Sequence, residues 1–188
     1  MTNNEIRLYP WQSKIFRSEA KNRVILAGRR SGKTILFRTL CYYTALLKPQ
    51  SEIMIVCTTI GQSKELYFNN FTNHFDPLFH PSLIDHINKQ DRIITLVNGS
   101  RITVTGAENP EALLGRSLDL LLMDEFQGIK EEVFTVYLQP MLADRNGDAV
   151  FSGTARRGDK LMDYYERGQE GNKYWKSWKV TTEESGSP

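Results

Sequence analysis

Ala27-Gly28-Arg29-Arg30-Ser31-Gly32-Lys33-Thr34 is the stretch of sequence that decides the fold. It matches the phosphate-binding loop pattern G-x-x-x-x-G-K-[ST] at every fixed position except the first, where Ala27 replaces glycine. The apolar run Val24–Ala27 before it predicts a buried strand, and the segment Lys33–Leu47 after it predicts a helix. Strand, small-residue loop and helix follow in the order that the pattern requires, so we predict a phosphate-binding loop here.

The chemistry of such a loop assigns roles to its residues. Successive backbone N–H groups and the start of the following helix attract phosphate oxygens. We expect Lys33 to reach the β and γ phosphates of a nucleotide and the Thr34 hydroxyl to ligate Mg²⁺. A glycine-rich turn that binds no ligand is the alternative for this stretch alone. The predicted nucleotide-binding residues are Gly28, Arg29, Arg30, Ser31, Gly32, Lys33 and Thr34.

A second motif ends the apolar run Leu120–Met123 with two adjacent carboxylates, Asp124 and Glu125. In nucleotide hydrolases such an Asp holds the Mg²⁺ shell, and such a Glu polarises the attacking water. Taken alone, the pair could be a solvated strand end. Downstream of a phosphate loop it indicates transfer to water, so we predict a Mg²⁺-dependent ATPase with Glu125 and Lys33 as catalytic residues and Thr34 and Asp124 as metal ligands.

Further apolar runs alternate with helical periodicity along the chain. Ile53–Thr58 and Ala149–Ser152 predict buried strands, and Ser63–Phe75 and Val133–Leu142 predict helices. Short apolar strands separated by helices favour an α/β fold, a mostly parallel sheet flanked by helices. With the two motifs, this is a P-loop NTPase of the class that carries a catalytic Glu. Ligands of such sheets gather at the carboxyl ends of the strands.

Two segments depart from this alternation. Arg92–Val97 and Arg101–Thr105 alternate in β-rich residues around Asn98-Gly99, which predicts an antiparallel hairpin near 91–105. Lys173–Lys179 alternates aromatic and basic residues, a pattern typical of a half-buried edge strand.

Length and composition set the outer limits. A chain of 188 residues favours one domain, which we place at residues 1–180, with the polar segment 181–188 as a linker or chain end. A formal charge of +2 does not by itself indicate a nucleic-acid-binding protein. Cys41 and Cys57 lie in apolar runs and are expected to be buried free thiols. No membrane span or signal sequence is expected.

The motifs together resemble those of a known family. Arg29–Thr34, Leu120–Glu125 and Ser152-Gly153-Thr154 are similar to the Walker A, Walker B and coupling motifs in the ATPase domain of the large terminase subunit of tailed double-stranded DNA bacteriophages. The similarity runs from about Tyr9 to Arg157, nearly the whole predicted domain. The resemblance implies a motor that hydrolyses ATP to move viral DNA into a capsid.

The resemblance also implies roles for residues outside the loop and Walker B motif. Gln12, in Tyr9-Pro10-Trp11-Gln12, would contact adenine, although a surface turn anchored by Trp11 is the alternative. Arg29 would contact the γ-phosphate as a catalytic residue, with Arg30 the less favoured neighbour. Ser152, Gly153 and Thr154 would couple the nucleotide state to movement.

Leu114-Gly115-Arg116 stands where the family often carries Leu-Arg-Gly. Arg116 would then act as a catalytic arginine finger on the ATP of a neighbouring subunit. The alternative is that it caps its own loop.

Partners and location follow from the same resemblance. It implies double-stranded DNA, the portal protein and the small terminase subunit as partners, a homo-oligomeric ring when assembled and a monomer in isolation, in the cytoplasm of an infected bacterium. Large terminases usually carry a nuclease domain after the ATPase, and we expect none in this chain. The rival functions are a helicase-like nucleic-acid translocase and a non-motor ATP-dependent switch.

Overall fold

The structure is a computed structural model and describes residues 7–73, 80–154, 158–181 and 184. Its strands are β1 (Asn22–Ala27), β2 (Glu52–Cys57), β3 (Ile84–Asn88), β4 (Ile93–Leu96), β5 (Arg101–Gly106), β6 (Leu120–Met123), β7 (Asp148–Gly153) and β8 (Trp175–Val180). Its α-helices are α1 (Pro10–Phe16), α2 (Lys33–Leu47), α3 (Ile60–Ser63), α4 (Asn69–Phe71), α5 (Gln139–Ala143) and α6 (Lys160–Gln169). Two π-helical turns are η1 (Lys64–Phe68) and η5 (Val133–Leu138), and three 3-10 turns are η2 (Pro81–Leu83), η3 (Pro110–Leu113) and η4 (Phe126–Gly128).

The strands form a single sheet in the order β3-β4-β5-β2-β6-β7-β1-β8. From β5 to β8 of that order every neighbouring pair is parallel, whereas β3, β4 and β5 pair antiparallel. The predicted parallel α/β sheet and the antiparallel hairpin near 91–105 are therefore confirmed. Because β7 lies between β6 and β1, the carboxyl ends of the three strands that carry motifs lie side by side.

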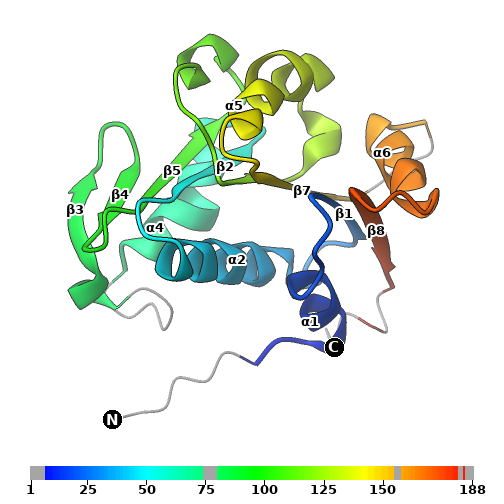
Figure 1. The fold of residues 1–188 in the computed structure, drawn as a ribbon, viewed down its shortest axis with the longest axis horizontal. Coiled ribbons are helices and arrows are strands. Elements are labelled where there is room, and N and C mark those ends of the chain that lie inside the picture. The colour runs from blue at the N-terminus through cyan, green and yellow to red at the C-terminus, as the bar shows by residue number, and fades with distance from the viewer. Residues whose placement is uncertain (1–6, 74–79, 155–157, 182–183, 185–188) are drawn as a thin grey trace.

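Helices cover both faces of this sheet (Figure 1). On one face α1, α2 and η1 pack on inward side chains of the strands, among them Ile25 and Ile55. On the other face η5, α5 and α6 pack on the intervening residues, such as Val24 and Val56. Side chains of a strand point alternately to the two faces, so each central strand contributes to both hydrophobic clusters. The continuous apolar runs of the sequence reflect this double burial.

The helix predicted over Val133–Leu142 is confirmed but irregular. Its first part is the π-helical turn η5, and α5 begins only at Gln139. Pro140 has no N–H and cannot donate the hydrogen bond of a continuing α-helix, which accounts for a change of winding at this point. The helix predicted from Ser63 begins earlier, at α3, and passes through η1 into α4. Residues 74–79 lie outside the described part.

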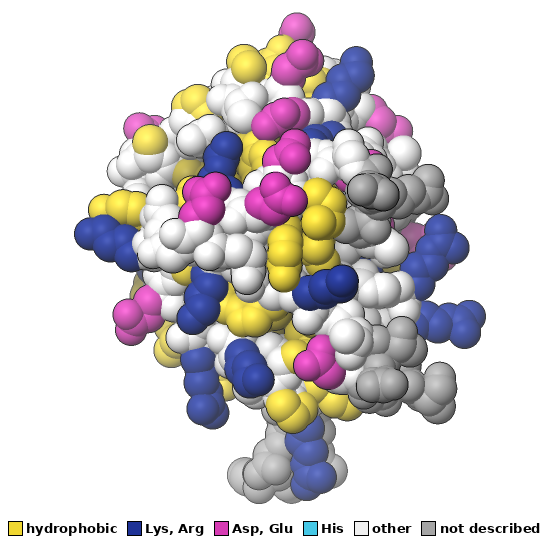
Figure 2. All heavy atoms as spheres, turned by 90° about the vertical axis from the view of Figure 1, so that its right-hand side faces the viewer, with side chains coloured by type: hydrophobic (Ala, Val, Ile, Leu, Met, Phe, Trp, Pro, Cys, Tyr) yellow, Lys and Arg dark blue, Asp and Glu magenta, His cyan; other side chains and the backbone are white. Residues whose placement is uncertain are grey.

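The segment Lys173–Lys179 forms an edge strand, as predicted. Strand β8 lies beside β1, and its other edge is unpaired among the described strands. Lys176 and Lys179 on this strand are exposed, and lysines at a sheet edge oppose pairing with another chain. Figure 2 shows this side of the molecule, where Lys and Arg gather mainly in the lower half and Asp and Glu in the upper half.

Sequence patterns did not indicate every element. Helix α6 and strand β3 were not predicted, and the parallel pairing of β8 with β1 was not either. Most of the predicted linker 181–188 lies outside the described residues. Within the described residues, none of the helices combines the length and the apolar character that a membrane crossing needs.

Candidate active site

The phosphate loop joins the end of β1 to the start of α2. Arg30 and Gly32 adopt the left-handed backbone, with φ of 60° and 94°. A Cβ at Gly32 would lie 2.9 Å from Nε2 of Gln12, so both the backbone angle and the available space favour glycine there. Arg29 and Arg30 are exposed on the outside of the loop. The two arginines are therefore accessible, whereas Gly32 is packed against α1.

The ammonium group of Lys33 lies between the loop and β6. Its Nζ donates hydrogen bonds of 3.0 Å to the carbonyl of Ala27 and 2.8 Å to that of Gly28. Oγ of Ser31 donates a 2.8 Å hydrogen bond to the same Gly28 carbonyl. Nζ also lies 3.7 Å from Oε1 of Glu125, on a side chain that is only 7% exposed. One buried positive charge is thus within reach of the loop and of the predicted general base.

Gln12 is completely buried beneath the loop. Its Oε1 accepts a 2.8 Å hydrogen bond from the backbone N–H of Tyr9, and its Nε2 donates one of 2.9 Å to the carbonyl of Gly32. The side chain therefore ties α1 to the loop from below. It does not lie in an exposed turn, and its contact with adenine stays a prediction.

The carboxylate of Asp124 is buried at the end of β6 and accepts three hydrogen bonds. The donors are the hydroxyl of Tyr67 at 2.7 Å, Oγ of Ser152 at 2.6 Å and the backbone N–H of Glu125 at 3.0 Å. The side chain of Thr34 lies near the same hydroxyl. Burial, followed by the charge of Asp124, raises the pKa of Tyr67 well above its ordinary value, so the phenol stays protonated.

Glu125 follows in a left-handed backbone conformation, with φ of 51° and ψ of 45°. A non-glycine residue in this region is under strain, and such residues cluster at functional sites. Nε2 of Gln127 donates a 2.5 Å hydrogen bond to Oε2, while Oε1 faces Lys33. The backbone turn thus directs the carboxylate back toward the phosphate loop.

The segment Ser152-Gly153-Thr154 contacts both motifs. Ser152 donates to Asp124, and Oγ1 of Thr154 donates a 3.3 Å hydrogen bond to the carbonyl of Ala27 at the start of the loop. Gly153 lies between them, at the end of β7. The position of β7 between β6 and β1 explains why one short segment reaches both sites.

Arg116 lies apart from this cluster. Its Nη1 donates a 2.8 Å hydrogen bond to Oγ1 of Thr103 on β5, and it lines a cavity of about 220 Å³ that also includes Asp91 and Asn109. Strand β2 separates β5 from β6 in the sheet. The structure therefore does not bring Arg116 to the phosphate loop of its own chain, and its action on a neighbouring subunit stays a prediction.

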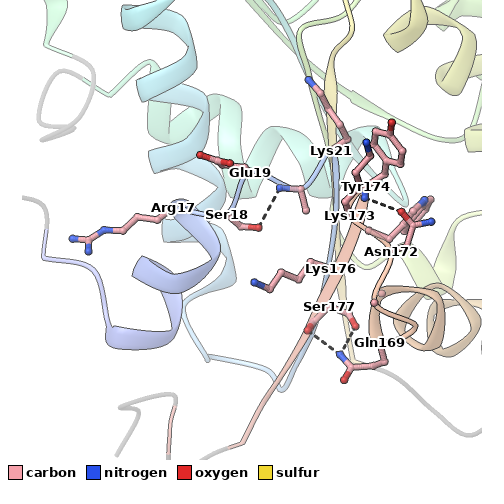
Figure 3. Close-up of a pocket in the computed structure, with 14 residues that line it drawn as sticks. Arg17, Ser18, Glu19, Lys21, Gln169, Asn172, Lys173, Tyr174, Lys176 and Ser177 are labelled. Carbon is pink, nitrogen blue, oxygen red and sulfur yellow. Dashed lines mark hydrogen bonds between the residues drawn. The ribbon is translucent and has the colours of Figure 1, made fainter.

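A cleft of about 320 Å³ lies beside the loop, where Gly28 and Thr154 face Tyr165 of α6 and Lys179 of β8. A larger cleft of about 1000 Å³ lies at the opposite end of β1 and β8 (Figure 3). Polar groups of the larger cleft already have partners: Gln169 donates to Ser177 within the cleft, and Lys21 pairs at 3.0 Å with Asp148, which lies outside the lining. Its size alone does not make it the reactive site, because Asp124, Glu125 and Lys33 lie near the carboxyl ends of the strands, away from this cleft.

The family described as "Terminase large subunit, T4likevirus-type, N-terminal" matches residues 24–186. This chain belongs to that family. The matched range includes the phosphate loop, Asp124, Glu125 and the segment 152–154, whereas Gln12 lies before it. The resemblance seen in the three sequence motifs is therefore confirmed.

Individual terminases are similar to this chain in sequence or in fold. The large terminase subunit of Escherichia phage T5 is 27% identical over 148 residues, which cover 75% of this chain and 32% of the relative. The large terminase ATPase domain of Thermus phage P74-26 superposes with a TM-score of 0.83 at 20% identity, over 95% of this chain and 83% of that one. The large terminase of another thermophilic bacteriophage, in complex with ATP-γ-S, gives a TM-score of 0.71 at 15% identity, over 97% and 47%. The chain thus spans about a third of the length of the curated relative.

Two residues of this terminase site were missed in the sequence. Gln127 stands two positions after Glu125, so a contact between its amide and that carboxylate could have been considered. A glutamine after a pair of carboxylates does not by itself indicate a functional residue. Tyr67 is separated from Asp124 by 57 residues and is brought to it by a π-helical turn. No local sequence pattern predicts that turn or the contact between Tyr67 and Asp124.

Proposed function

We propose that this chain hydrolyses ATP with Mg²⁺ and that the hydrolysis powers movement of double-stranded DNA into a phage capsid. The observation that supports it best is the position of Lys33, whose Nζ hydrogen-bonds to the loop and lies 3.7 Å from Glu125. A phosphate-binding group and a base for water are thus adjacent. Membership in the terminase family supports the DNA substrate.

Each residue of the site would have a separate role in the reaction. Backbone N–H groups of the loop and the Lys33 ammonium would bind the β and γ phosphates. Glu125 would accept a proton from water as the water oxygen attacks the γ phosphorus and the bond to the ADP oxygen breaks. Arg29 would offset the charge that develops on the γ-phosphoryl oxygens. The products are ADP and phosphate.

The donor set suits Mg²⁺. Thr34 and Asp124 offer a hydroxyl and a carboxylate oxygen, ligands that Mg²⁺ accepts together with substrate phosphates and water. Tyr67 hydrogen-bonds to Asp124 and lies near Thr34, so it helps to hold the carboxylate beside the hydroxyl. When bound, Mg²⁺ would neutralise part of the charge on the β and γ phosphates.

The test is the rate of Mg²⁺-dependent ATP hydrolysis, compared between the parent chain and Glu125→Gln. Loss of a positioned general base is expected to lower kcat by about 10²- to 10⁴-fold, whereas ADP affinity should stay within about twofold because the loop is intact. Equal rates in parent and variant would show that Glu125 is not the base. Tight ATP binding with no turnover in any assembly state would favour the non-motor switch.

We expect the domain to act as a homo-oligomeric ring on the portal protein, with the small terminase subunit as a further partner, in the cytoplasm of an infected bacterium. Arg116 would then serve a neighbour's ATP. Turnover per subunit should rise with protein concentration in the parent but not in Arg116→Ala; turnover independent of concentration in both would remove this role.

A further inference from the structure

The side chain of Gln127 bridges Glu125 and the segment that follows β7. Its Nε2 donates a 2.5 Å hydrogen bond to Oε2 of Glu125. A carboxylate accepts and cannot donate, so the –NH₂ end of the amide must face Glu125 and the oxygen must face away. The orientation of Gln127 is therefore set by the residue that it binds.

The oxygen of this amide is buried and has no hydrogen-bond partner among the described residues. Leaving a buried acceptor unpaired costs about 1–3 kcal/mol, and native proteins contain few such groups. A side chain chosen only for packing would avoid this cost. The hydrogen bond from Nε2 to Glu125 offsets part of this cost and fixes which end of the amide faces the carboxylate.

Gly153 makes the close approach of the two segments feasible. A Cβ built on Gly153 would lie 1.9 Å from Oε1 of Gln127 and 3.0 Å from its Cδ. The amide thus lies directly against the backbone of Gly153. Ser152, the preceding residue, donates to Asp124. A shift of this segment would therefore disturb the contacts of both Asp124 and Glu125.

We propose that Gln127 is a positioning residue that holds the Glu125 carboxylate for water activation and transmits displacements of the segment 152–154 to it. The inference rests on the proposed ATP hydrolysis. Lys33 and Gln127 hold the two oxygens of Glu125, and Lys33 is also the residue expected to bind phosphate. If Lys33 moves to bind phosphate, the Gln127 amide would still hold Oε2 of Glu125.

The deciding variant is Gln127→Met, which keeps the length of the side chain and removes the donor. We expect kcat for Mg²⁺-ATP to fall by at least about 10-fold, since the base is no longer oriented. KM for ATP and the affinity for ADP should stay within about twofold, because no phosphate contact is lost. The melting temperature should stay the same or rise, since the unpaired oxygen is removed. A purely structural role would instead lower the melting temperature and leave kcat of the folded fraction unchanged.

Two further variants complete the experiment. Gly153→Ala should reproduce the loss of kcat, and the double variant should be no slower than the slower single variant, because both changes break the same contact. Gln139→Met, at an exposed position of α5, is the matched control and should behave as the parent. Parental kcat in Gln127→Met, with turnover that still depends on Glu125, would overturn the inference alone. Absence of Glu125-dependent turnover in the parent would overturn the proposed function and the inference with it.

Discussion

The hydroxyl of Tyr67 donates a 2.7 Å hydrogen bond to Oδ2 of Asp124. Tyr67 is fully buried and belongs to the π-helical turn η1, a kind of turn that is frequent at functional sites. The side chain of Thr34, at the start of α2, lies near the same hydroxyl. One phenol therefore joins the helical segment after β2 to the end of β6, close to the phosphate loop.

Removing this hydroxyl should weaken the response to metal more than it weakens nucleotide binding. In Tyr67→Phe we expect the Mg²⁺ concentration for half-maximal ATP turnover to rise by about 10-fold, the scale on which partners of metal ligands act. ADP affinity without Mg²⁺ should not change. A magnesium titration of turnover measures this, with Tyr43→Phe at an exposed position as the control. An unchanged titration curve would mean that Tyr67 only fills space.

Gly106, at the end of β5, should not tolerate a side chain. A Cβ there would lie 2.3 Å from the backbone N of Ile60 and 2.5 Å from the backbone carbonyl carbon of Thr59. Backbone atoms cannot move aside as a flexible side chain can, so Gly106→Ala should reduce the free energy of unfolding by about 2–3 kcal/mol. Urea unfolding measures the change.

Gly61 provides the matched control for that substitution. Its nearest neighbour would be Oγ1 of Thr59 at 4.0 Å, and it lies within α3. Gly61→Ala should therefore be neutral or raise the free energy of unfolding by up to about 1 kcal/mol. Equal destabilisation in both variants would contradict the predicted steric cause.

Both cysteines should be unreactive in the native protein. Burial raises the pKa of the Cys41 and Cys57 thiols, and for Cys57 the charges of Asp124 and Glu125 raise it further. Because the thiolate is the reactive form, a disulfide reagent at pH 8 should label neither thiol until the chain unfolds in urea. Rapid native labelling of one thiol per chain would show that one of them is accessible.

Local sequence patterns were sufficient for the parts of the fold that are regular along the chain. The loop before α2, the apolar run ending at Asp124 and the turn at Asn98-Gly99 each carry their signal within a few residues, and the structure forms a strand, a helix or a hairpin there. The central strands are buried on both faces of the sheet, so they could be predicted from continuous apolar runs in the sequence.

The order of the strands and the contacts of the site could not be predicted in the same way. Ser152 meets Asp124 because β7 lies between β6 and β1, and that order follows from packing of the whole sheet. Tyr67 depends on a π-helical turn, for which sequence periodicity gives no signal. The requirement for glycine at position 153 is apparent only from the structure, where Gln127 lies against its backbone. Each of these features depends on residues that are distant in the sequence, so a local sequence pattern cannot predict it.

Asp119 is a buried carboxylate immediately before β6. Oδ1 lies 2.5 Å from Nζ of Lys48, and Oδ2 accepts hydrogen bonds of 2.9 Å from Arg145 and 2.8 Å from the backbone N–H of Glu52. Burial alone would raise its pKa, but these hydrogen bonds and charges outweigh burial, so the pKa lies below its ordinary value.

A depressed pKa in the folded state fixes the sign of the pH dependence. The unfolded chain has an Asp pKa of about 3.9, so the stabilisation by Asp119 is complete above that pH and is lost as pH falls through the lower folded pKa. Asp119→Asn should cost about 1–3 kcal/mol of unfolding free energy at pH 7, because it removes the charge and one acceptor. The difference from the parent should shrink below about pH 4, since the parent's carboxylate is then protonated too.

Urea unfolding of parent and variant between pH 2.5 and 7 measures this difference, with Asp85→Asn at an exposed position of β3 as the control. If the difference between parent and Asp119→Asn stays constant across that range, its cause is packing of the amide and not the charge. If it shrinks toward low pH while the control stays level, the buried carboxylate contributes through Lys48 and Arg145, which tie the loops after α2 and α5 to the start of β6.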